Sequence, residues 1–364
     1  MKYIDEFRDR RLIDKVAGEI RGEADTVRTY NFMEVCGTHT MSIFRFGLRD
    51  ILPGNINLIS GPGCPVCVTP NEFIDKAIAL ARRENIVIAT FGDMFKVPGS
   101  YSSLEKEKAL GAAIRMVYSS MDALELARKT PGKEVVFLGI GFETTAPTVA
   151  QSIIAAKKSG IKNYSVLCGH KTMPEALKVL TNEPKLKIDG FLLPGHVSAI
   201  IGVEPYEFLI ARGKRCVVTG FEPLDILQAI WMLLKQEKPK VEIQYTRIIN
   251  KKGNKLAIKS MDKVFSPCDS TWRGIGRIKG SGLKIRREFS AYDAELKFHP
   301  VIPAPRVNKA CICGEVIKGI KTPFQCRLFA KACTPEHPVG ACMVSSEGAC
   351  AAYYKYRGKA QGAR

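Results

Sequence analysis

Short apolar stretches alternate with amphipathic segments along the first 240 residues of the chain. Each apolar stretch is bounded by glycine and is followed by a segment with the hydrophobic period of a helix. Strands buried on both faces give short apolar runs of this kind, so the alternation predicts α/β architecture with parallel sheets covered by helices. The predicted strands span residues 30–35, 56–60, 86–91, 134–138, 164–167, 191–193 and 216–219, and the predicted helices include residues 1–25 and 223–235.

Side chains that can do chemistry come just past the carboxyl ends of these predicted strands. Cys36 follows the first strand, and Cys64 and Cys67 follow the second. Open α/β sheets bind ligands at this edge, where the strand ends meet. We therefore expect two helix-covered, mainly parallel sheet domains that face a shared cleft, at residues 1–125 and 126–240.

The pattern changes after residue 240, and the last region, residues 241–364, ends with Cys326, Cys333, Cys342 and Cys350. Proline and glycine break this segment into turns and helix ends, so its thiolates can converge on one point. Converging thiolates select zinc or an iron–sulfur cluster. Structural zinc usually takes ligands two to four residues apart, whereas the spacings here are six, eight and seven residues. We therefore expect a C-terminal [4Fe-4S] cluster domain; zinc, and reduced structural cysteines or disulfides, are the alternatives.

Two other thiol motifs lie at strand exits. Cys64-Pro-Val-Cys67 is a C-x-x-C at a strand-to-helix turn, a position typical of redox dithiols because the helix amino terminus lowers the pKa of the first thiol. Half of a zinc site, or buried inert thiols, are the alternatives. Cys36 and His39 place a thiol and an imidazole three residues apart, which suits iron, zinc or copper, or a nucleophile with its base.

The loop after the fourth strand contains Glu143, Thr144 and Thr145 behind two glycines. It lacks the lysine of a phosphate-binding loop and the third glycine of a dinucleotide loop, so it predicts a helix cap or a docking surface instead. His170 and His196 each follow a glycine at a strand end. We interpret each of them as a hydrogen-bonded structural histidine.

Length and composition limit the class of protein. With 364 residues and 46 % hydrophobic residues, the chain can bury sizeable cores in two or three domains. No long apolar run predicts a membrane-spanning helix, and the charged amino terminus lacks the apolar region of a signal peptide, so we expect a cytoplasmic protein. Twelve cysteines in a reducing compartment indicate metal binding or thiol chemistry.

The formal net charge of +19 is partly local, because residues 246–289 hold twelve Lys or Arg against three acidic residues. This segment also contains Trp272 but no recognisable nucleic-acid motif. We expect a solvated basic face, or a docking surface for an acidic partner, rather than a nucleic-acid site.

Four motifs occur together and in one order along nearly the whole chain. They are Cys36-Gly-Thr-His-Thr, Gly61-Pro-Gly-Cys-Pro-Val-Cys67, Gly141-Phe-Glu-Thr-Thr145 and the cysteine-rich stretch 326–356. In these motifs the chain resembles the HypD family of [NiFe]-hydrogenase maturation proteins. Five cysteines fall outside the motifs and receive no role: Cys168, Cys216, Cys268, Cys311 and Cys313.

The resemblance implies a scaffold that assembles the Fe(CN)2CO group, with mononuclear iron carrying CN and CO as the intermediate, rather than a conventional turnover enzyme. It implies a complex with the chaperone HypC, cyanide delivery by HypE with HypF, and an indirect link to the hydrogenase large subunit. The implied site residues are Cys36 and His39 as iron ligands in the cleft, Cys64 and Cys67 as the redox thiol pair, Cys326, Cys333, Cys342 and Cys350 as ligands of the [4Fe-4S] cluster, and Glu143, Thr144 and Thr145 near the cleft or a partner.

Two functions of other classes stay open on the residues alone. One is a basic, zinc-stabilised nucleic-acid-binding module. The other is a thiol oxidoreductase that acts on other proteins.

Overall fold

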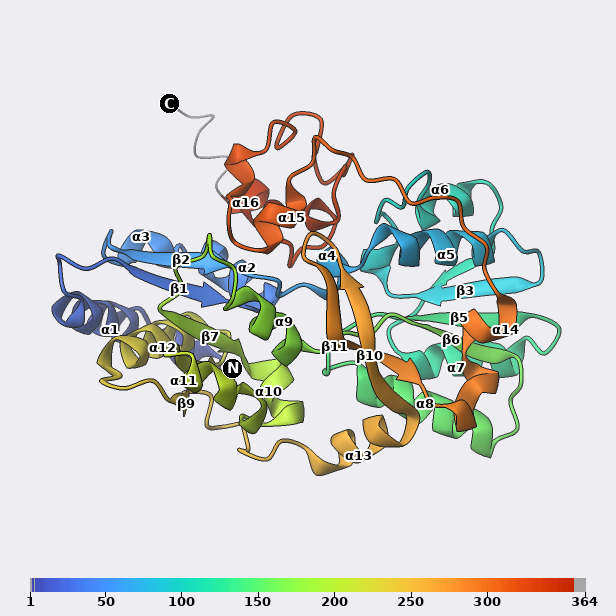
Figure 1. Cartoon of the computed structure of the whole chain (residues 1–364), viewed down its shortest axis with the longest axis horizontal. Helices are drawn as coiled ribbons and strands as arrows, with labels where there is room; N and C mark the ends of the chain where they lie inside the picture. Colours follow the sequence, from blue (N-terminus) through green and yellow to red (C-terminus); the bar gives the residue numbers. More distant parts are fainter. Residues whose placement is uncertain (1, 3, 357–364) are drawn as a thin grey trace.

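The computed structural model describes residues 2 and 4–356, and it contains two separate parallel sheets (Figure 1). The first, sheet A, has the strand order β2-β1-β7-β8-β9, and the second, sheet B, has the order β4-β3-β5-β6. The strands of sheet A are β1 (Tyr30–Glu34), β2 (Ile56–Ser60), β7 (Gly190–Pro194), β8 (Arg215–Thr219) and β9 (Val241–Ile243). Those of sheet B are β3 (Ile86–Thr90), β4 (Ile114–Met116), β5 (Glu134–Gly139) and β6 (Tyr164–Cys168).

The predicted α/β class with parallel sheets is confirmed, and each of the seven predicted strands is present within a residue or two of its expected ends. The short strand β4 was not predicted, because two of its three residues are exposed and leave no apolar run. The two sheets draw strands from both sides of residue 125: β1 pairs with β7, and β3 pairs with β5. The division of the chain into three domains stays a prediction, and so does the shared cleft.

Alternating side chains of the strands face different helix layers. In sheet B, Val135 and Phe137 pack in one core cluster, whereas Val136 and Leu138 pack in another on the opposite face. The first cluster includes the helices α7 (Ser120–Lys129) and α8 (Ala146–Lys158), and the second includes α5 (Asn71–Ala81) and α6 (Leu104–Ala109).

Sheet A follows the same rule. Phe32 and Leu192 pack on one face against α1 (Arg10–Glu23) and α12 (Pro223–Lys235), which also contact each other. The predicted helix at residues 1–25 begins at Arg10 because Asp9 caps it by accepting hydrogen bonds from the backbone N–H groups of Arg11 and Leu12. The other helices of this region are α2 (Gly37–Arg45), α3 (Leu48–Ile51), α4 (Pro65–Val68), α9 (Met173–Leu180), α10 (Gly195–Ile201) and α11 (Glu207–Ala211).

The last third of the chain crosses the space between the two sheets (Figure 1). A long antiparallel hairpin of β10 (Phe265–Trp272) and β11 (Gly276–Ile285) runs through the centre, and the cysteine-rich end covers it. The helices here are α13 (Lys255–Val264), α14 (Ala294–Phe298), α15 (Cys313–Ile317) and α16 (Ala349–Tyr356). The 3-10 turns of the chain are Asp5–Arg8, Gly92–Met94, Glu204–Tyr206, Arg287–Tyr292, Pro323–Gln325 and Ala341–Met343.

Trp272 connects the hairpin to the core. Its side chain is fully buried, its Nε1–H donates a hydrogen bond of 2.9 Å to Ser281 Oγ, and its ring stacks on Phe142 at 5.7 Å between centroids. The basic segment therefore uses its tryptophan as a packing residue rather than as a surface aromatic. Among the described residues, no helix is long and apolar enough to span a membrane.

We expect Trp272→Ala to lower the free energy of unfolding by about 3–5 kcal/mol, because it leaves a cavity where a large buried ring was. Leu256→Ala on α13 is the matched control, since that side chain is 78 % exposed, and it should change the free energy by less than about 0.5 kcal/mol. Urea unfolding of both variants checks this. Equal unfolding midpoints for the two variants would show that Trp272 does not hold the hairpin.

Candidate functional site

The loops that follow β1 and β2 touch each other at the carboxyl edge of sheet A. The backbone N–H of Gly37 donates a hydrogen bond of 3.1 Å to the carbonyl of Gly63. A side chain at Gly63 would overlap the backbone of Cys36, so only glycine permits this close approach. The two thiol motifs predicted from the sequence are therefore neighbours in space, with Cys36 just before α2 and Cys64 just before α4.

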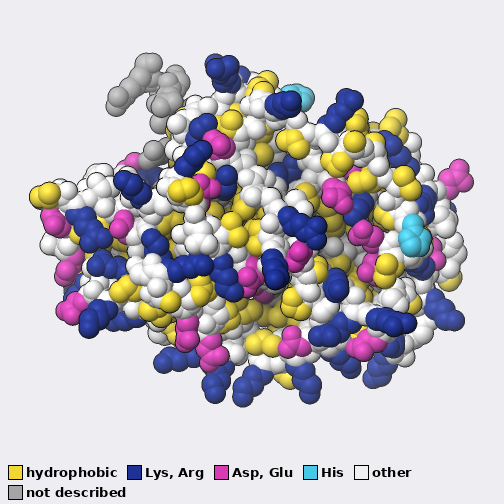
Figure 2. All heavy atoms as spheres, in the orientation of Figure 1, with side chains coloured by type: hydrophobic (Ala, Val, Ile, Leu, Met, Phe, Trp, Pro, Cys, Tyr) yellow, Lys and Arg dark blue, Asp and Glu magenta, His cyan; other side chains and the backbone are white. Residues whose placement is uncertain are grey.

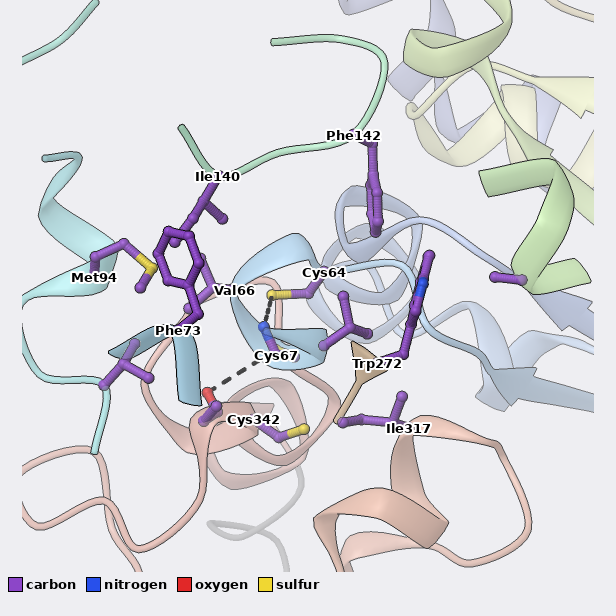
Figure 3. Close-up of a cluster of buried hydrophobic side chains, with 14 of the residues drawn as sticks. Cys64, Val66, Cys67, Phe73, Met94, Ile140, Phe142, Trp272, Ile317 and Cys342 are labelled. Carbon is purple, nitrogen blue, oxygen red and sulfur yellow. Dashed lines mark hydrogen bonds between the residues drawn. The ribbon is translucent and has the colours of Figure 1, made fainter. Parts of the chain in front are cut away.

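Cys64 and Cys67 form a buried pair of free thiols (Figure 3). The backbone N–H of Cys67 donates a hydrogen bond of 3.3 Å to Cys64 Sγ. Burial raises the pKa of the Cys67 thiol well above its usual value, and the adjoining thiols of Cys342 and Cys64 raise it further. Cys67 is therefore held as a protonated thiol near neutral pH.

Cys36 is also buried, and its thiol lies near two carboxyl groups. Burial raises the pKa of the Cys36 thiol to about 12, and the nearby Glu347 carboxylate adds to this increase. Glu34, at the end of β1, accepts hydrogen bonds from Thr40 Oγ1 (2.6 Å) and from the backbone N–H of Cys36 (3.3 Å). Burial raises the pKa of Glu34 to about 8.

Sequence reasoning missed Glu34 and Glu347. A signal for Glu34 was available, because it is the one acidic residue of a mainly apolar strand and lies two residues before Cys36. Glu347 reaches the site only through tertiary packing: Thr38 Oγ1 at the start of α2 donates a hydrogen bond of 2.6 Å to its Oε1.

His39 points toward the end of β8. Its Nε2 donates a hydrogen bond of 2.9 Å to the carbonyl of Gly220, which leaves Nδ1 as an acceptor with no partner among the described residues. Its ring stacks on Phe221, and the ring of His196, from the end of β7, stacks on Phe221 as well. Burial lowers the pKa of His39 to about 4, so the imidazole is neutral.

The four cysteines predicted at the end of the chain line one small cavity, and two more cysteines join them. This cysteine cavity encloses only about 10 Å³, and Val316, Phe329 and Met343 supply apolar walls. Its thiols belong to Cys311, Cys313, Cys326, Cys333, Cys342 and Cys350. The two additional cysteines, spaced as C-x-C, had been given no role because no family motif contains them.

Cys342 connects the cysteine cavity to the dithiol. The pKa of its thiol is shifted by Cys313 and Cys350 in the cavity and by Cys67 outside it, so these thiols are close neighbours. Cys67 Sγ also lies 3.9 Å from the carbonyl oxygen of Ala341 (Figure 3). The dithiol and the cysteine cavity therefore share one wall.

The segment that carries Cys342 is anchored to both sheets. Ser345 Oγ donates a hydrogen bond of 3.0 Å to Asp93 after β3, while Glu347 contacts the start of α2. Phe44 of α2 and Tyr353 of α16 add a ring contact at 4.4 Å between centroids. These contacts hold the cysteine-rich end against the strand exits of sheets A and B at once.

The loop with Glu143 has a structural role in this geometry. Glu143 is buried, and its Oε1 accepts a hydrogen bond of 3.0 Å from the backbone N–H of Met173, the first residue of α9. Thr145 Oγ1 fills the position that a side chain at Gly141 (φ +153°) would need, and Thr144 is half-buried beside it. Burial raises the pKa of Glu143 to about 7.

A separate group of polar side chains lies after β6. Cys168 Sγ is 3.5 Å from His170 Nδ1 and donates a hydrogen bond to the carbonyl of Leu283, and Cys268 lines the same cavity. Cys216 is buried in β8. Across the part of the chain that the structure describes, no three His, Cys, Asp or Glu side chains are arranged to hold a single metal ion.

Comparison with known proteins gives the class of protein. A family model described as HypD, hydrogenase formation hypA family, matches residues 11–357. The hydrogenase maturation factor HypD of Rhizobium leguminosarum bv. viciae is 49 % identical over 368 residues, which cover 98 % of this chain and 96 % of that protein. The HypD proteins of Rhodobacter capsulatus (46 % identical; 98 % and 99 % covered) and Escherichia coli K12 (44 %; 98 % and 98 %) match similarly.

These matches are to proteins of hydrogenase formation and maturation. The chain belongs to the HypD family, and the resemblance noted from the four motifs is confirmed.

The raised pKa of Glu143 predicts a pH dependence of stability. Because the folded state binds this proton more tightly than the unfolded state, the carboxyl stabilises the fold fully below its usual pKa of 4.5, and the contribution is lost as the pH rises through about 7. The side chain of Glu143→Gln cannot ionise, so the free energy of unfolding of this variant should fall less between pH 4.5 and 7 than that of the unmodified chain. The difference between the two falls should be at most about 3 kcal/mol. Urea unfolding of both proteins across this range checks it, and equal slopes against pH would contradict it.

Proposed function

We propose that the chain is a cytoplasmic scaffold on which the Fe(CN)2CO group of [NiFe]-hydrogenase is assembled, with a [4Fe-4S] cluster in the cysteine cavity and Cys64/Cys67 as a redox pair. One observation carries this proposal: Cys67 Sγ lies 3.9 Å from the carbonyl oxygen of Ala341, and the next residue, Cys342, lines the cysteine cavity. An electron can pass from a source to an acceptor in that arrangement without a large movement of the chain.

The donor set of the cysteine cavity fits an iron–sulfur cluster. Six soft sulfur donors line one cavity with apolar walls, and three of them are buried. Iron–sulfur clusters are held by cysteine thiolates. Structural zinc usually takes ligands two to four residues apart, whereas the four C-terminal cysteines are six, eight and seven residues apart, which favours a cluster over zinc. The proposed ligands are Cys326, Cys333, Cys342 and Cys350, with Cys311 and Cys313 at the same cavity.

Such a cluster, when bound, supplies single electrons. We propose that Cys64 and Cys67 receive these electrons. A disulfide between these two residues takes up two electrons and two protons to give two thiols. The burial that raises the pKa of Cys67 favours the protonated product, so the pocket itself favours the reduced pair.

The iron that becomes Fe(CN)2CO is the cargo, and we propose that Cys36 and His39 receive it. The Cys36 thiol lies near the carboxyl groups of Glu34 and Glu347, and it must lose its proton when it binds iron. His39 offers Nδ1, because Nε2 is already occupied by Gly220. A thiolate from HypC completes the proposed iron site, HypE with HypF delivers cyanide, and the hydrogenase large subunit receives the product indirectly. Glu143, Thr144 and Thr145 shape the neighbouring loop rather than bind iron.

Two structural observations weigh against the other functions left open by the sequence. The basic segment buries its tryptophan, which leaves no aromatic platform there for stacking nucleic-acid bases. Cys64 and Cys67 are 4 % and 3 % exposed, so a disulfide of another folded protein cannot reach them. Both observations favour an internal redox pair.

We expect Cys36→Ala and Cys67→Ala to fail differently. Cys36→Ala removes a proposed ligand of the cargo iron, so iron beyond the cluster and both the cyanide and carbon monoxide infrared bands should be lost. Cys67→Ala leaves Cys36 in place but breaks the dithiol, so part of this iron should remain without a completed Fe(CN)2CO signal. Anaerobic co-purification with HypC, followed by metal analysis and infrared spectroscopy, checks both.

Cys36→Ser should not restore the non-cluster iron or the infrared bands, because a hydroxyl stays protonated near neutral pH and binds soft metals poorly. Cys168→Ala is the control, since this cysteine lies in the separate cavity after β6. If Cys36→Ala keeps full non-cluster iron and both infrared bands, Cys36 is not the assembly site.

A further inference from the structure

A large basic groove adjoins the cysteine cavity. It encloses about 1140 Å³, and the charged side chains of its lining are five basic ones and one acidic one: Arg273, Arg306, Lys309, Lys318, Lys321 and Glu315. Cys311 and Cys313 line both the groove and the cysteine cavity. These two thiols therefore form the boundary between the groove and the proposed cluster site.

Arg273 is fixed at this boundary. Its backbone N–H donates a hydrogen bond of 2.7 Å to the carbonyl of Val68, and its Nε donates one of 2.8 Å to the carbonyl of Thr69. The guanidinium interacts electrostatically with Cys311 and Cys313, and its Nη2 has no partner among the described residues. A positive charge is thus built in beside the two thiols.

The rim of the groove keeps a positive charge even after its internal pairs are considered. Lys321 pairs with Glu315 at 2.8 Å, and Lys318 pairs with Glu183 at 3.8 Å. Arg306 lies over the ring of Tyr101, and Lys309 is exposed beside it on the segment that leads to Cys311. Lys and Arg side chains are also spread over the face of the molecule shown in Figure 2, with fewer acidic ones between them.

The groove is open and charged, and it is large enough to take part of another protein. Small-molecule sites enclose about 300–1,000 Å³, and this groove, at about 1140 Å³, lies just above that range. Gly274 of the hairpin turn and Gly314 of α15 pack backbone to backbone, so no side chain can stand between them. The surface beside Cys311 and Cys313 is therefore low enough for another protein to approach closely.

We propose that the basic groove docks a small, acidic one-electron carrier protein, and that Cys311 and Cys313 are the point at which its electron enters the cysteine cavity. The inference rests on the proposed function, since it needs an electron acceptor in that cavity. Each docking event oxidises the carrier by one electron and reduces the acceptor by one electron, with no bond made or broken. Two events supply the electrons that a Cys64–Cys67 disulfide needs, and the two protons come from solvent.

Charge does not separate an acidic protein from RNA, but the aromatic content of the groove does. Single-stranded nucleic acid binds through aromatic stacking along a basic path. Trp272, the one aromatic residue among the described residues that line the groove, is buried, and Arg306 covers the half-exposed ring of Tyr101 nearby. An acidic protein needs only the charged rim and close access to the thiols.

The test uses the full chain, purified anaerobically, and a reduced acidic [2Fe-2S] ferredoxin as the probe. Arg306→Glu/Lys309→Glu reverses two charges at the groove. Lys255→Glu/Lys259→Glu on α13 is the matched control, because it reverses two exposed charges outside the groove and changes the net charge equally. At about 50 mM salt, the groove variant should weaken ferredoxin binding at least about tenfold, and the control less than about threefold, because attraction between charges acts mainly within about a Debye length.

Calorimetry measures the affinity without depending on electron transfer. Equal weakening by both variants, no binding by the unmodified chain, or displacement of ferredoxin by single-stranded RNA overturns the docking proposal.

Reduction of the visible chromophore of the chain by ferredoxin is then compared with its reduction by dithionite. If dithionite reduces the chromophore but ferredoxin does not bind, docking alone fails. If ferredoxin binds at the groove but neither reductant changes any chromophore, the proposed electron-supply function fails, and this inference fails with it.

Discussion

The contact between Cys67 and the segment that carries Cys342 depends on how the cysteine-rich end packs between the two sheets. Ser345 holds this end to sheet B through Asp93, and Glu347 holds it to sheet A through Thr38. Parallel sheets expose their carboxyl edges as the place where loops converge. Because one segment binds both edges, the thiols of the C-terminal region and of the C-x-x-C loop are brought into a single buried group.

Burial is the second constraint, and it favours the neutral form of each ionisable group in this region. It raises the pKa values of Cys36, Cys67, Glu34 and Glu143, and it lowers that of His39. All of these groups are therefore driven toward their neutral forms in the protein alone. A metal cation that binds there replaces protons on the thiols, so metal binding and proton release are coupled in this site.

The sequence predicted the strands well because strands buried on both faces leave short apolar runs between glycines. It could not predict which strands share a sheet, since β1 pairs with β7 across more than 150 residues, and pairing over that distance leaves no local pattern. The same limit applies to the site. Cys64 and Cys67 carry a local motif, whereas Glu347, Cys311 and Cys313 reach the site only through tertiary packing.

The central claim is that the cysteine cavity holds an iron–sulfur cluster beside the dithiol. The most direct measurement is iron and acid-labile sulfide per chain after anaerobic purification, for Cys333→Ala and for the control Cys216→Ala, whose cysteine is buried in β8 away from the cavity. The unmodified chain and the control should hold about four of each, and Cys333→Ala should lose most of both together with the visible absorption. Unchanged iron and sulfide in Cys333→Ala would contradict the account.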